Sequence, residues 1–254
     1  MPLDFSRSLT GPERTEAGNA QLGYGLAFVA GATNAGAFLA VRQYTSHMTG
    51  LLSSMADAFA LQQWPVAAAA FGGLLAFLAG ASFSAMLVLY AIRRRLRSAF
   101  ALPLLLEALL LITFGLLGAR LATINGLFVP VTVMLLCFMM GLQNALISKI
   151  SHAVIRTTHV TGMITDLGIE FGRALYWNRT RTHRDGPVRA DRHRMRVLLR
   201  LIGSFFIGGV LGAIGFNRVG YIATVPLAAL LIFFAFAPVM DDLARTRRRS
   251  EVPL

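Results

Sequence analysis

Cysteine and charged residues are scarce in this chain. Cys137 is the single cysteine among 254 residues, so no disulfide can form within the chain. Charged residues make up 14% of the sequence, whereas hydrophobic residues make up 56%. Several apolar runs reach about 18 residues or more, the length at which a helix begins to span a bilayer. The composition excludes an ordinary soluble protein and predicts an all-α, polytopic membrane protein.

Acidic residues and catalytic motifs are also few. The chain has 12 Asp and Glu against 24 Lys and Arg. The arginines gather beside the apolar runs, where positive charge marks the cytoplasmic side of a membrane. Anionic lipid head groups, and not nucleic acid, are therefore the expected partners. The chain has no nucleophile elbow, no phosphate-binding loop, no dinucleotide-binding glycine motif and no His and Cys grouping typical of zinc, so we expect no enzyme activity, no cofactor and no metal.

One polar sequence motif occurs twice in this largely apolar chain. Each copy reads Phe-x-x-Gly-x-x-Asn-Ala and continues, after a short gap, to Ser/Thr-His-x-Thr-Gly. The first copy covers residues 28–50 and the second covers residues 138–162. A second matched element, Phe-x-x-Gly, follows each copy and begins at Phe77 and at Phe205. Such a repeat predicts two halves that meet at a shared site.

The apolar runs predict six full transmembrane helices, over residues 22–39, 65–92, 102–118, 127–147, 197–216 and 221–240. Because residues 31–36 include Gly, Thr and Asn, we expect the first span to be kinked or interrupted and to face protein. Residues 41–63 and 148–176 carry the His-x-Thr-Gly motifs and are too polar for full spans. They are expected to form two re-entrant or half-length helices.

Charge indicates the topology. With six spans and a cytoplasmic amino terminus, the basic clusters at 93–97, at 173–196 and in the C-terminal tail all lie inside, and both termini are cytoplasmic. Eight full spans cannot place the first two clusters inside together. Three spans per half invert the second half relative to the first, so we expect two inverted 3+3 repeats, as in many secondary transporters.

This topology divides the chain into a small number of segments. The expected segments are a polar, disordered tail (1–21), a first membrane repeat (22–119), a second membrane repeat (127–240) that includes an arginine-rich cytoplasmic loop (173–196), and a basic tail (241–254).

The repeated residues resemble those of the YoaK-like family of bacterial inner-membrane proteins, a domain of unknown function. The resemblance covers residues 22–238. It rests on Gly31, Asn34, Ala35, His47, Thr49 and Gly50 in the first half, and on Gly141, Gln143, Asn144, Ala145, Thr161, Gly162 and residues 165–168 in the second. Relatives often place Asn after the first Thr-Gly, where this chain has Leu51. The resemblance implies a multi-pass protein of the bacterial inner membrane and no established activity.

The motif residues are the candidate binding residues: Asn34, His47, Thr49, Gly50, Asn144, His159, Thr161 and Gly162. If each motif opens a half-helix, then Ser46, Thr49, Thr158 or Thr161 can cap its first amides. Amides left uncapped favour an anion or a polar group, to which the histidines can also donate hydrogen bonds. The alternative is that these polar groups only satisfy one another within the bilayer.

Two carboxylates are candidates for proton coupling. Glu107 lies within a predicted span and has no counterpart in the other half, and a carboxylate inside a membrane is a functional hypothesis by default. Alternatively, it pairs with an arginine of the 93–97 cluster. Asp166 is placed to meet His159, as Asp57 is placed to meet His47. Leu51 and the unmatched Glu107 predict an asymmetric site.

These features favour a secondary transporter or permease for a small polar or anionic solute, bound between the two repeats. The first alternative is a scaffold, sensor or partner subunit that acts through the basic cytoplasmic loop. The second is an intramembrane enzyme that uses a histidine with Glu107 or Asp166. The solute is not identified by the sequence, which is also compatible with a homo-oligomer.

Overall fold

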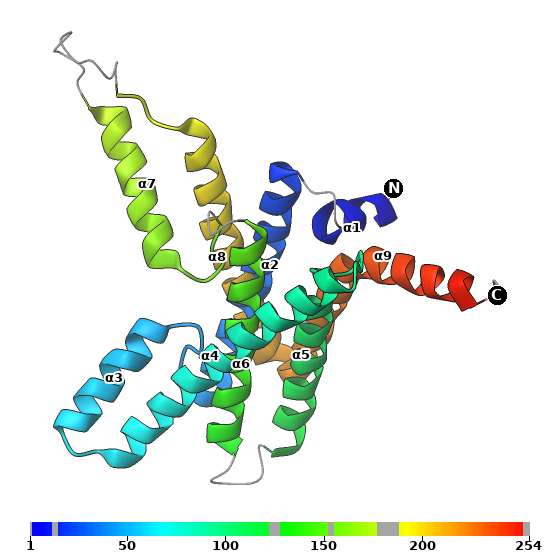
Figure 1. Ribbon diagram of the computed structural model, residues 1–254. Coiled ribbons are helices and arrows are strands. Elements are labelled where there is room, and N and C mark those ends of the chain that lie inside the picture. Colours follow the sequence, from blue (N-terminus) through cyan, green and yellow to red (C-terminus); the bar gives the residue numbers. More distant parts are fainter. Residues whose placement is uncertain (1, 12–14, 122–127, 152–154, 177–187, 251–254) are drawn as a thin grey trace.

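The computed structural model describes residues 2–11, 15–121, 128–151, 155–176 and 188–250. Within these ranges the protein is all-helical and contains no strand (Figure 1). The helices are α1 (Pro2–Thr10), α2 (Glu16–Val41), α3 (Met48–Ala60), α4 (Trp64–Arg93), α5 (Ala101–Leu121), α6 (Phe128–Ile150), α7 (Val160–Leu175), α8 (Arg192–Val219), the short 3-10 helix η1 (Gly220–Ala223) and α9 (Thr224–Ser250).

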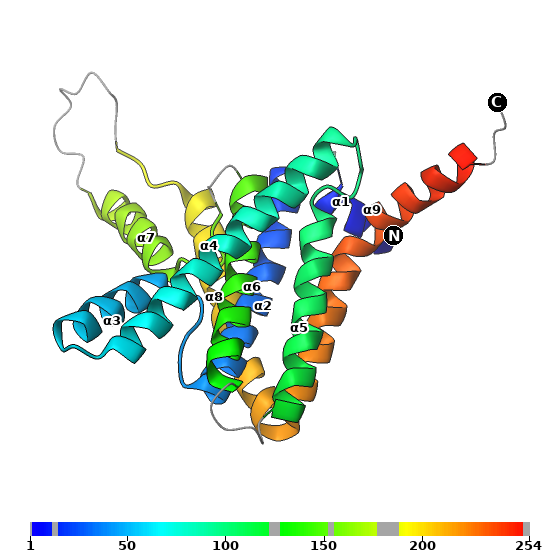
Figure 2. The same ribbon diagram turned by 60° about the horizontal axis from the view of Figure 1, so that its bottom comes forward.

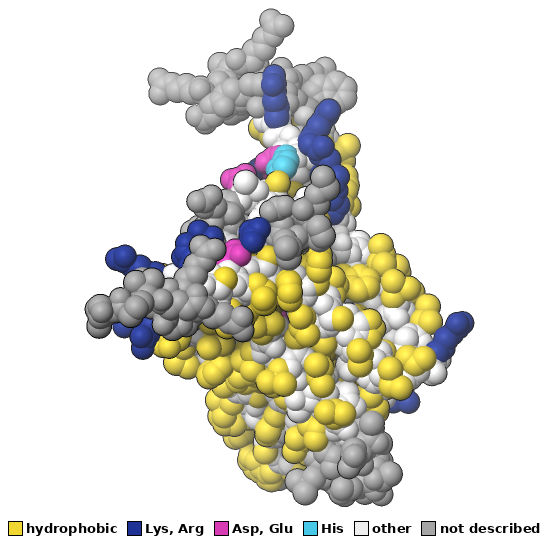
Figure 3. Space-filling model, turned by 90° about the vertical axis from the view of Figure 1, so that its right-hand side faces the viewer, with side chains coloured by type: hydrophobic (Ala, Val, Ile, Leu, Met, Phe, Trp, Pro, Cys, Tyr) yellow, Lys and Arg dark blue, Asp and Glu magenta, His cyan; other side chains and the backbone are white. Residues whose placement is uncertain are grey.

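Five helical stretches of the described chain are long and apolar enough to cross a membrane. They are Glu16–Val41, Trp64–Arg93, Ala101–Gly118, Pro130–Ile150 and Arg192–Arg245. The last stretch contains α8, η1 and most of α9. Figure 3 shows a broad hydrophobic surface, with most Lys and Arg side chains toward one end of the view. A wide apolar surface on helices of this length identifies a multi-pass membrane protein.

The first apolar run forms one continuous helix, α2, from Glu16 to Val41. The prediction of an interrupted span is therefore wrong, although the helix does face protein, because residues from Leu22 to Ala37 are largely buried. The backbone keeps its helical hydrogen bonds through the Gly and Asn positions. Its break comes later, where Arg42 adopts a left-handed conformation with φ 56° and ends the helix. The small residues allow close packing against the neighbouring helix.

The crossing of α2 with α8 depends on two glycines. A Cβ placed on Gly31 would overlap the carbonyl oxygen of Phe205, and a Cβ on Gly208 would overlap that of Phe28. Each Phe-x-x-Gly element thus presents a bare glycine to the backbone of the other helix. Such small residues let two membrane helices approach closely and gain packing contacts that lipid cannot supply.

The crossing of α4 with α6 has the same construction. A Cβ on Gly80 would overlap the carbonyl oxygen of Phe138, and a Cβ on Gly141 would overlap that of Phe77. The four matched Phe-x-x-Gly elements, which begin at Phe28, Phe77, Phe138 and Phe205, are therefore used in two reciprocal crossings. Each crossing joins the first long helix of one half to the second long helix of the other.

Helices α5 and α9 lie side by side in both ribbon views and complete the bundle (Figures 1 and 2). The rings of Phe114 and Tyr221 meet edge to face, with centroids 5.5 Å apart, where η1 leads into α9. Phe114 is fully buried in the main hydrophobic core, together with residues of α2 and α6.

The amino-terminal segment is not the disordered polar tail that its composition suggested. Residues 2–10 form α1, which packs on α9. Ser6 and Thr10 both donate hydrogen bonds to the carbonyl oxygen of Phe234, and Arg7 pairs with Asp241 at 2.8 Å. Leu9 is fully buried in the core. Partners more than 200 residues away stabilise this helix, so a local reading of the sequence could not reveal it.

The two segments of ambiguous polarity form the short helices α3 and α7. They have 13 and 16 residues, and at 1.5 Å per residue they are about 20 and 24 Å long, short of the hydrocarbon thickness of about 30 Å. Both begin near the middle of the molecule and run outward in different directions, each beside the long helix that follows it in sequence (Figures 1 and 2).

Candidate functional site

A single pocket brings the two copies of the polar motif together. Its volume is about 1100 Å³, and its walls come from α2, α6, α8 and the starts of α3 and α7. Six of the eight candidate binding residues line it: Asn34, His47, Thr49, Asn144, His159 and Thr161. Residues from α8 that were not among the candidate binding residues, including Phe205, Gly209 and Ala213, form another wall.

Gly50 and Gly162 support the pocket from behind the histidines. A Cβ on Gly50 would lie 2.6 Å from Nδ1 of His47, and a Cβ on Gly162 would overlap Nδ1 of His159. The spacing His-x-x-Gly therefore has a steric cause: the imidazole folds back over the first turn of its own helix, where only glycine leaves room for it. Both glycines position a histidine and are not themselves part of the pocket wall.

The histidines, and not the hydroxyl residues, occupy the N-cap positions of the short helices. His47 is the N-cap residue of α3 and His159 is that of α7, but neither side chain bonds to the first amides. The prediction that Ser46, Thr49, Thr158 or Thr161 caps these helices is wrong. The Ser46 and Thr158 hydroxyls are instead bonded to asparagines of the long helices.

The asparagines tie each long helix to the short helix that follows it. Asn34 Nδ2 donates to Ser46 Oγ at 2.5 Å, and Thr158 Oγ1 donates to Asn144 Oδ1 at 2.7 Å. Asn144 Nδ2 also donates to the carbonyl oxygen of Met140 at 2.8 Å. Part of the polar motif is thus hydrogen-bonded within the protein, which agrees with the alternative that these polar groups only satisfy one another. Asn34 is the exception, because it is 6% exposed and its Oδ1 has no hydrogen-bond partner.

The starts of α3 and α7 give the pocket a positive electrostatic character. The first amides of an α-helix have no intrahelical acceptor, and the helix dipole places partial positive charge at the same end. Because no side chain in the described ranges caps either helix, these amides remain available at the pocket wall formed by Met48, Thr49, Val160 and Thr161. This arrangement attracts an anion or the negative end of a polar solute.

The lining differs between the two copies. Arg156 lines the pocket three residues before His159, and its Nη1 lies 3.3 Å from His159 Nδ1. Tyr44 stands three residues before His47 and stacks on Phe38, with ring centroids 4.8 Å apart. Neither Arg156 nor Tyr44 was singled out from the sequence. Aligning the two motif copies position by position would have found both, because they occupy the same place relative to the histidine.

Glu107 lies outside the pocket, in the core between α5, α6 and α2. Its side chain is fully buried, and Gln143 Nε2 donates to Glu107 Oε1 at 2.9 Å and to the carbonyl oxygen of Leu26 at 3.2 Å. Gln143 Oε1 and Glu107 Oε2 have no partner. The alternative in which Glu107 pairs with an arginine of residues 93–97 is wrong, because its partner is a glutamine on α6.

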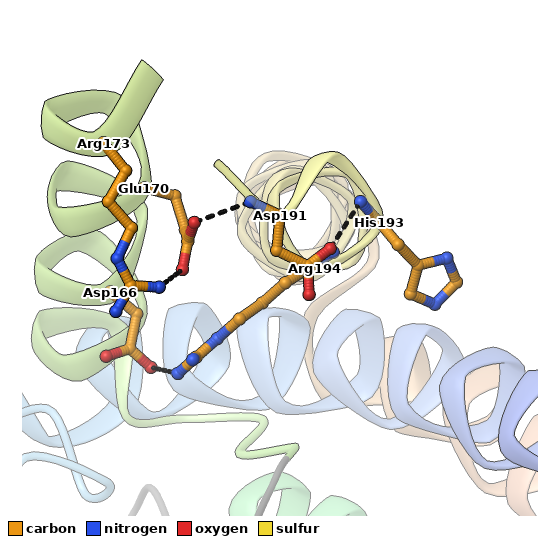
Figure 4. Close-up of polar contacts among 6 residues, drawn as sticks. All are labelled: Asp166, Glu170, Arg173, Asp191, His193 and Arg194. Carbon is orange, nitrogen blue, oxygen red and sulfur yellow. Dashed lines mark hydrogen bonds and ion pairs between the residues drawn. The ribbon is translucent and has the colours of Figure 1, made fainter. Parts of the chain in front are cut away.

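Asp166 takes part in the ionic contacts that join α7 to α8. It pairs with Arg194 at 2.9 Å and does not line the pocket (Figure 4). The contact expected between Asp166 and His159 is therefore replaced by an ion pair with the next helix, and His159 lies beside Arg156 instead. Asp57 is exposed on α3 and is likewise not part of the pocket wall.

A second carboxylate stabilises the same junction (Figure 4). Glu170 is buried, and its two oxygens accept hydrogen bonds from the Arg173 side chain and from the Asp191 amide, both at 2.8 Å. Asp191 in turn caps α8, where it accepts from the amides of His193 and Arg194. The hydrogen bond from the Arg194 amide is the main cause that lowers the pKa of Asp191. Residues 177–187 of the arginine-rich loop lie outside the described residues.

No three His, Cys, Asp or Glu side chains gather into a metal-binding group within the described ranges. The chemistry of the pocket is that of hydrogen-bond donors, one guanidinium and aromatic faces.

A protein-family model whose description reads "Protein of unknown function (DUF1275)" matches residues 22–237. Comparison with curated proteins and with solved structures gives no match.

Proposed function

The chain belongs to the DUF1275 family, and we propose that it is a secondary transporter or permease that binds a small polar or anionic solute in the pocket between its two halves. The family includes YoaK, so the resemblance drawn from the repeated motif is confirmed. The family description names no activity, and the proposal therefore depends on the site itself.

We propose further that the membrane domain contains six full spans and two half-length helices. The stretch Arg192–Arg245 counts as two spans, because α8 ends at Gly220, which has φ 62° and turns the chain into η1 and α9. Helices α3 and α7 are the half-length elements. Counted in this way, residues 22–119 and 127–240 each contribute three spans and one half-length helix, and the second repeat is inverted relative to the first.

The arrangement of the helix ends supports this topology. In Figure 2 the C-terminal ends of α4, α7 and α9 all lie toward the top of the view. These ends adjoin the three basic clusters of the sequence. The positive-inside rule assigns that side to the cytoplasm of a bacterial inner membrane, together with both termini. In Figure 1, α3 and α7 run outward in different directions, α7 toward the top of the view and α3 toward the bottom left.

One observation carries the functional proposal: a single pocket contains the matched Asn, His and Thr residues of both copies and the uncapped starts of both short helices. In transporters with inverted repeats, solutes bind near the bilayer midplane, where half-helix N-termini meet at the repeat interface. A pocket of about 1100 Å³ is large enough for a small solute together with water.

Solute flux through purified protein in liposomes tests this proposal. The pocket can be filled by Gly209→Leu, because Gly209 lines the pocket and a Cβ there meets no atom closer than 3.8 Å. Gly203→Leu on the same helix is the matched control, because a Cβ there has nothing within 4 Å and the residue does not line the pocket. We expect uptake of at least one solute from a panel of sugars, amino acids and organic acids by the parent and the Gly203→Leu protein, and at least about tenfold slower uptake by Gly209→Leu.

Two results would contradict the proposal. Equal uptake by Gly209→Leu and Gly203→Leu would show that solute does not pass through this pocket. A folded parent protein that moves no solute of the panel would favour the alternative of a scaffold, sensor or partner subunit that works through its basic loop.

A further inference from the structure

The charges around the pocket point to the class of solute. Arg156 lines the pocket, and no Asp or Glu belongs to its described wall. No carboxylate of the described residues pairs with Arg156, whose guanidinium lies beside His159 instead. A guanidinium without an acidic partner, beside an uncapped helix start, is a recognition element for carboxylate or phosphate oxygens.

The hydroxyl and amide groups around Arg156 complete a cradle for such an oxyanion. Ser148 and Thr161 also line the pocket from the second half, and the first amides of α7 have no side-chain cap. Donors on α6, on the segment that precedes α7 and on α7 itself therefore line the same pocket as Arg156. The other copy offers the stacked rings of Phe38 and Tyr44 at the matching positions, so the two ends of the pocket differ in chemistry.

Asn34 provides an independent sign that a ligand belongs here. It is 94% buried, lines the pocket and has an Oδ1 without a partner, while its Nδ2 is already bonded to Ser46. A buried acceptor left without a donor costs about 1–3 kcal/mol, so a ligand donor that reaches it is favoured. The missing group is a hydrogen-bond donor such as a hydroxyl or ammonium, which chloride, nitrate and sulfate lack.

From these two observations we propose that the pocket binds a small organic anion that carries an oxyanion group for Arg156 and a hydroxyl or ammonium donor for Asn34. The assignment rests on the proposed binding pocket but not on transport. Arg156 is a specificity-determining residue that selects the anion, and Asn34 selects solutes with a hydrogen-bond donor over purely apolar anions.

Thermal unfolding of the full chain in nanodiscs of phosphatidylcholine tests the assignment with three probes. Gluconate has a carboxylate and hydroxyls, hexanoate has only the carboxylate, and glucose has only hydroxyls. At constant ionic strength, we expect gluconate to raise the melting temperature more than either other probe. Arg156→Gln should weaken gluconate binding by about tenfold, the loss of one charge-assisted hydrogen bond, with partial recovery in Arg156→Lys. Asn34→Leu should remove the advantage of gluconate over hexanoate.

Arg218→Gln is the control for charge, because Arg218 is exposed at the end of α8 and does not line the pocket. It should leave gluconate binding unchanged. Equal stabilisation by glucose and gluconate would overturn the anion assignment and leave the transport proposal standing. Stabilisation by gluconate without flux of any panel solute would support the anion assignment and contradict the transport proposal.

A lipid head group is the other source of an oxyanion. Replacing a third of the phosphatidylcholine by phosphatidylglycerol separates the two sources. We expect gluconate to stabilise the protein in both kinds of disc. If its effect disappears in the anionic discs, a lipid head group occupies the pocket at Arg156 and the soluble-anion assignment is wrong.

Discussion

The two halves of the molecule share their construction at the helix crossings and differ at the pocket wall. Gly31 of α2 contacts the backbone of α8 in the way that Gly141 of α6 contacts the backbone of α4. Each short helix begins with a histidine folded over a glycine. Yet Tyr44 in the first half corresponds to Arg156 in the second. The repeated residues build the scaffold, and the residues that differ give the pocket its chemistry.

A second difference lies in the core. Gln143 precedes Asn144 in the second copy and bonds to Glu107, whereas Thr33 precedes Asn34 in the first copy. Thr33 is fully buried, and its hydroxyl has no partner. Glu107 has no counterpart in the second half, and its partner Gln143 on α6 has no counterpart in the first half. The cores of the two halves therefore differ at this position, and Glu107 stays a candidate for proton coupling.

The short helices are held by different forces. Helix α3 packs on α4 through apolar residues such as Leu51 and Ala58, both of which are buried. Helix α7 packs on α8 and is joined to it by the ion pair of Asp166 with Arg194 and by the hydrogen bond from the Asp191 amide to Glu170 (Figure 4). The packing of α7 on α8 should therefore weaken with acid and with salt, whereas the packing of α3 on α4 should not.

The largest effect is expected at the shared crossings. Gly31→Val and Gly141→Val should each reduce the free energy of unfolding by about 3 kcal/mol, because the new side chain must displace a backbone carbonyl of the partner helix. Unfolding in detergent micelles measures the change, with Gly203→Val on α8 as a control that has no close neighbour. If only one of the two substitutions lowered the free energy of unfolding, the two crossings would not be equivalent.

The core difference predicts unequal costs. Glu107→Ala should lower the free energy of unfolding by about 2 kcal/mol, because the Gln143 amide loses its carboxylate acceptor. Thr33→Val, which removes a buried hydroxyl without a partner, should be neutral or stabilising. The same unfolding assay compares them. A destabilised Thr33→Val protein would show that Thr33 has a partner of its own and that the halves differ less than the structure indicates.

A smaller inequality is expected at the asparagines. Ser46→Ala removes the hydrogen-bond partner of Asn34 and should cost about 1 kcal/mol, whereas Thr158→Ala should cost about 0.5 kcal/mol because Asn144 keeps its bond to Met140. A binding solute that reaches Asn34 should reduce the first cost and leave the second unchanged. Equal costs with and without solute would argue that neither asparagine contacts it.

The smallest effect is the pH dependence expected at the junction of α7 with α8. The hydrogen bond from the Arg194 amide lowers the pKa of Asp191 below its ordinary value of about 3.9. The stabilisation is therefore complete above about pH 4 and is lost as the pH falls through the lowered pKa. Hydrogen exchange, corrected for its intrinsic pH dependence, should quicken at the start of α8 below about pH 4 and not at the start of α4. Asp191→Asn keeps a capping side chain and should abolish this pH dependence; its persistence would assign the effect to another group.

The sequence predicted the helical class, the short helices and six pocket-lining residues, because these depend on apolar run length and on a pattern written twice. It could not predict α1, since Ser6 and Arg7 depend on partners in α9. It misplaced the break near Asn34, because Gly and Asn weaken a helix in isolation, whereas packing against α8 keeps α2 continuous.

The pocket chemistry was predicted only in part. The motif identified only the residues that the two copies share. Arg156 and Tyr44 occupy the same position in the two copies but differ in type, so the motif did not reveal them. The capping role assigned to the Ser and Thr residues was wrong for a spatial reason. Asn34 and Asn144 lie on the long helices at a distance that only the folded chain defines, and they engage Ser46 and Thr158 first.

The central claim is that two oppositely oriented halves place their short helices on opposite sides of one pocket. Leu61 and Leu175 adjoin the outer ends of α3 and α7 and are 68% and 84% exposed, whereas the native Cys137 is fully buried. Labelling Leu61→Cys and Leu175→Cys with a membrane-impermeant maleimide therefore tests the claim directly. We predict that Leu61→Cys is labelled in intact spheroplasts and that Leu175→Cys is labelled only after the membrane is opened. Labelling of both from the same side would contradict the inverted arrangement.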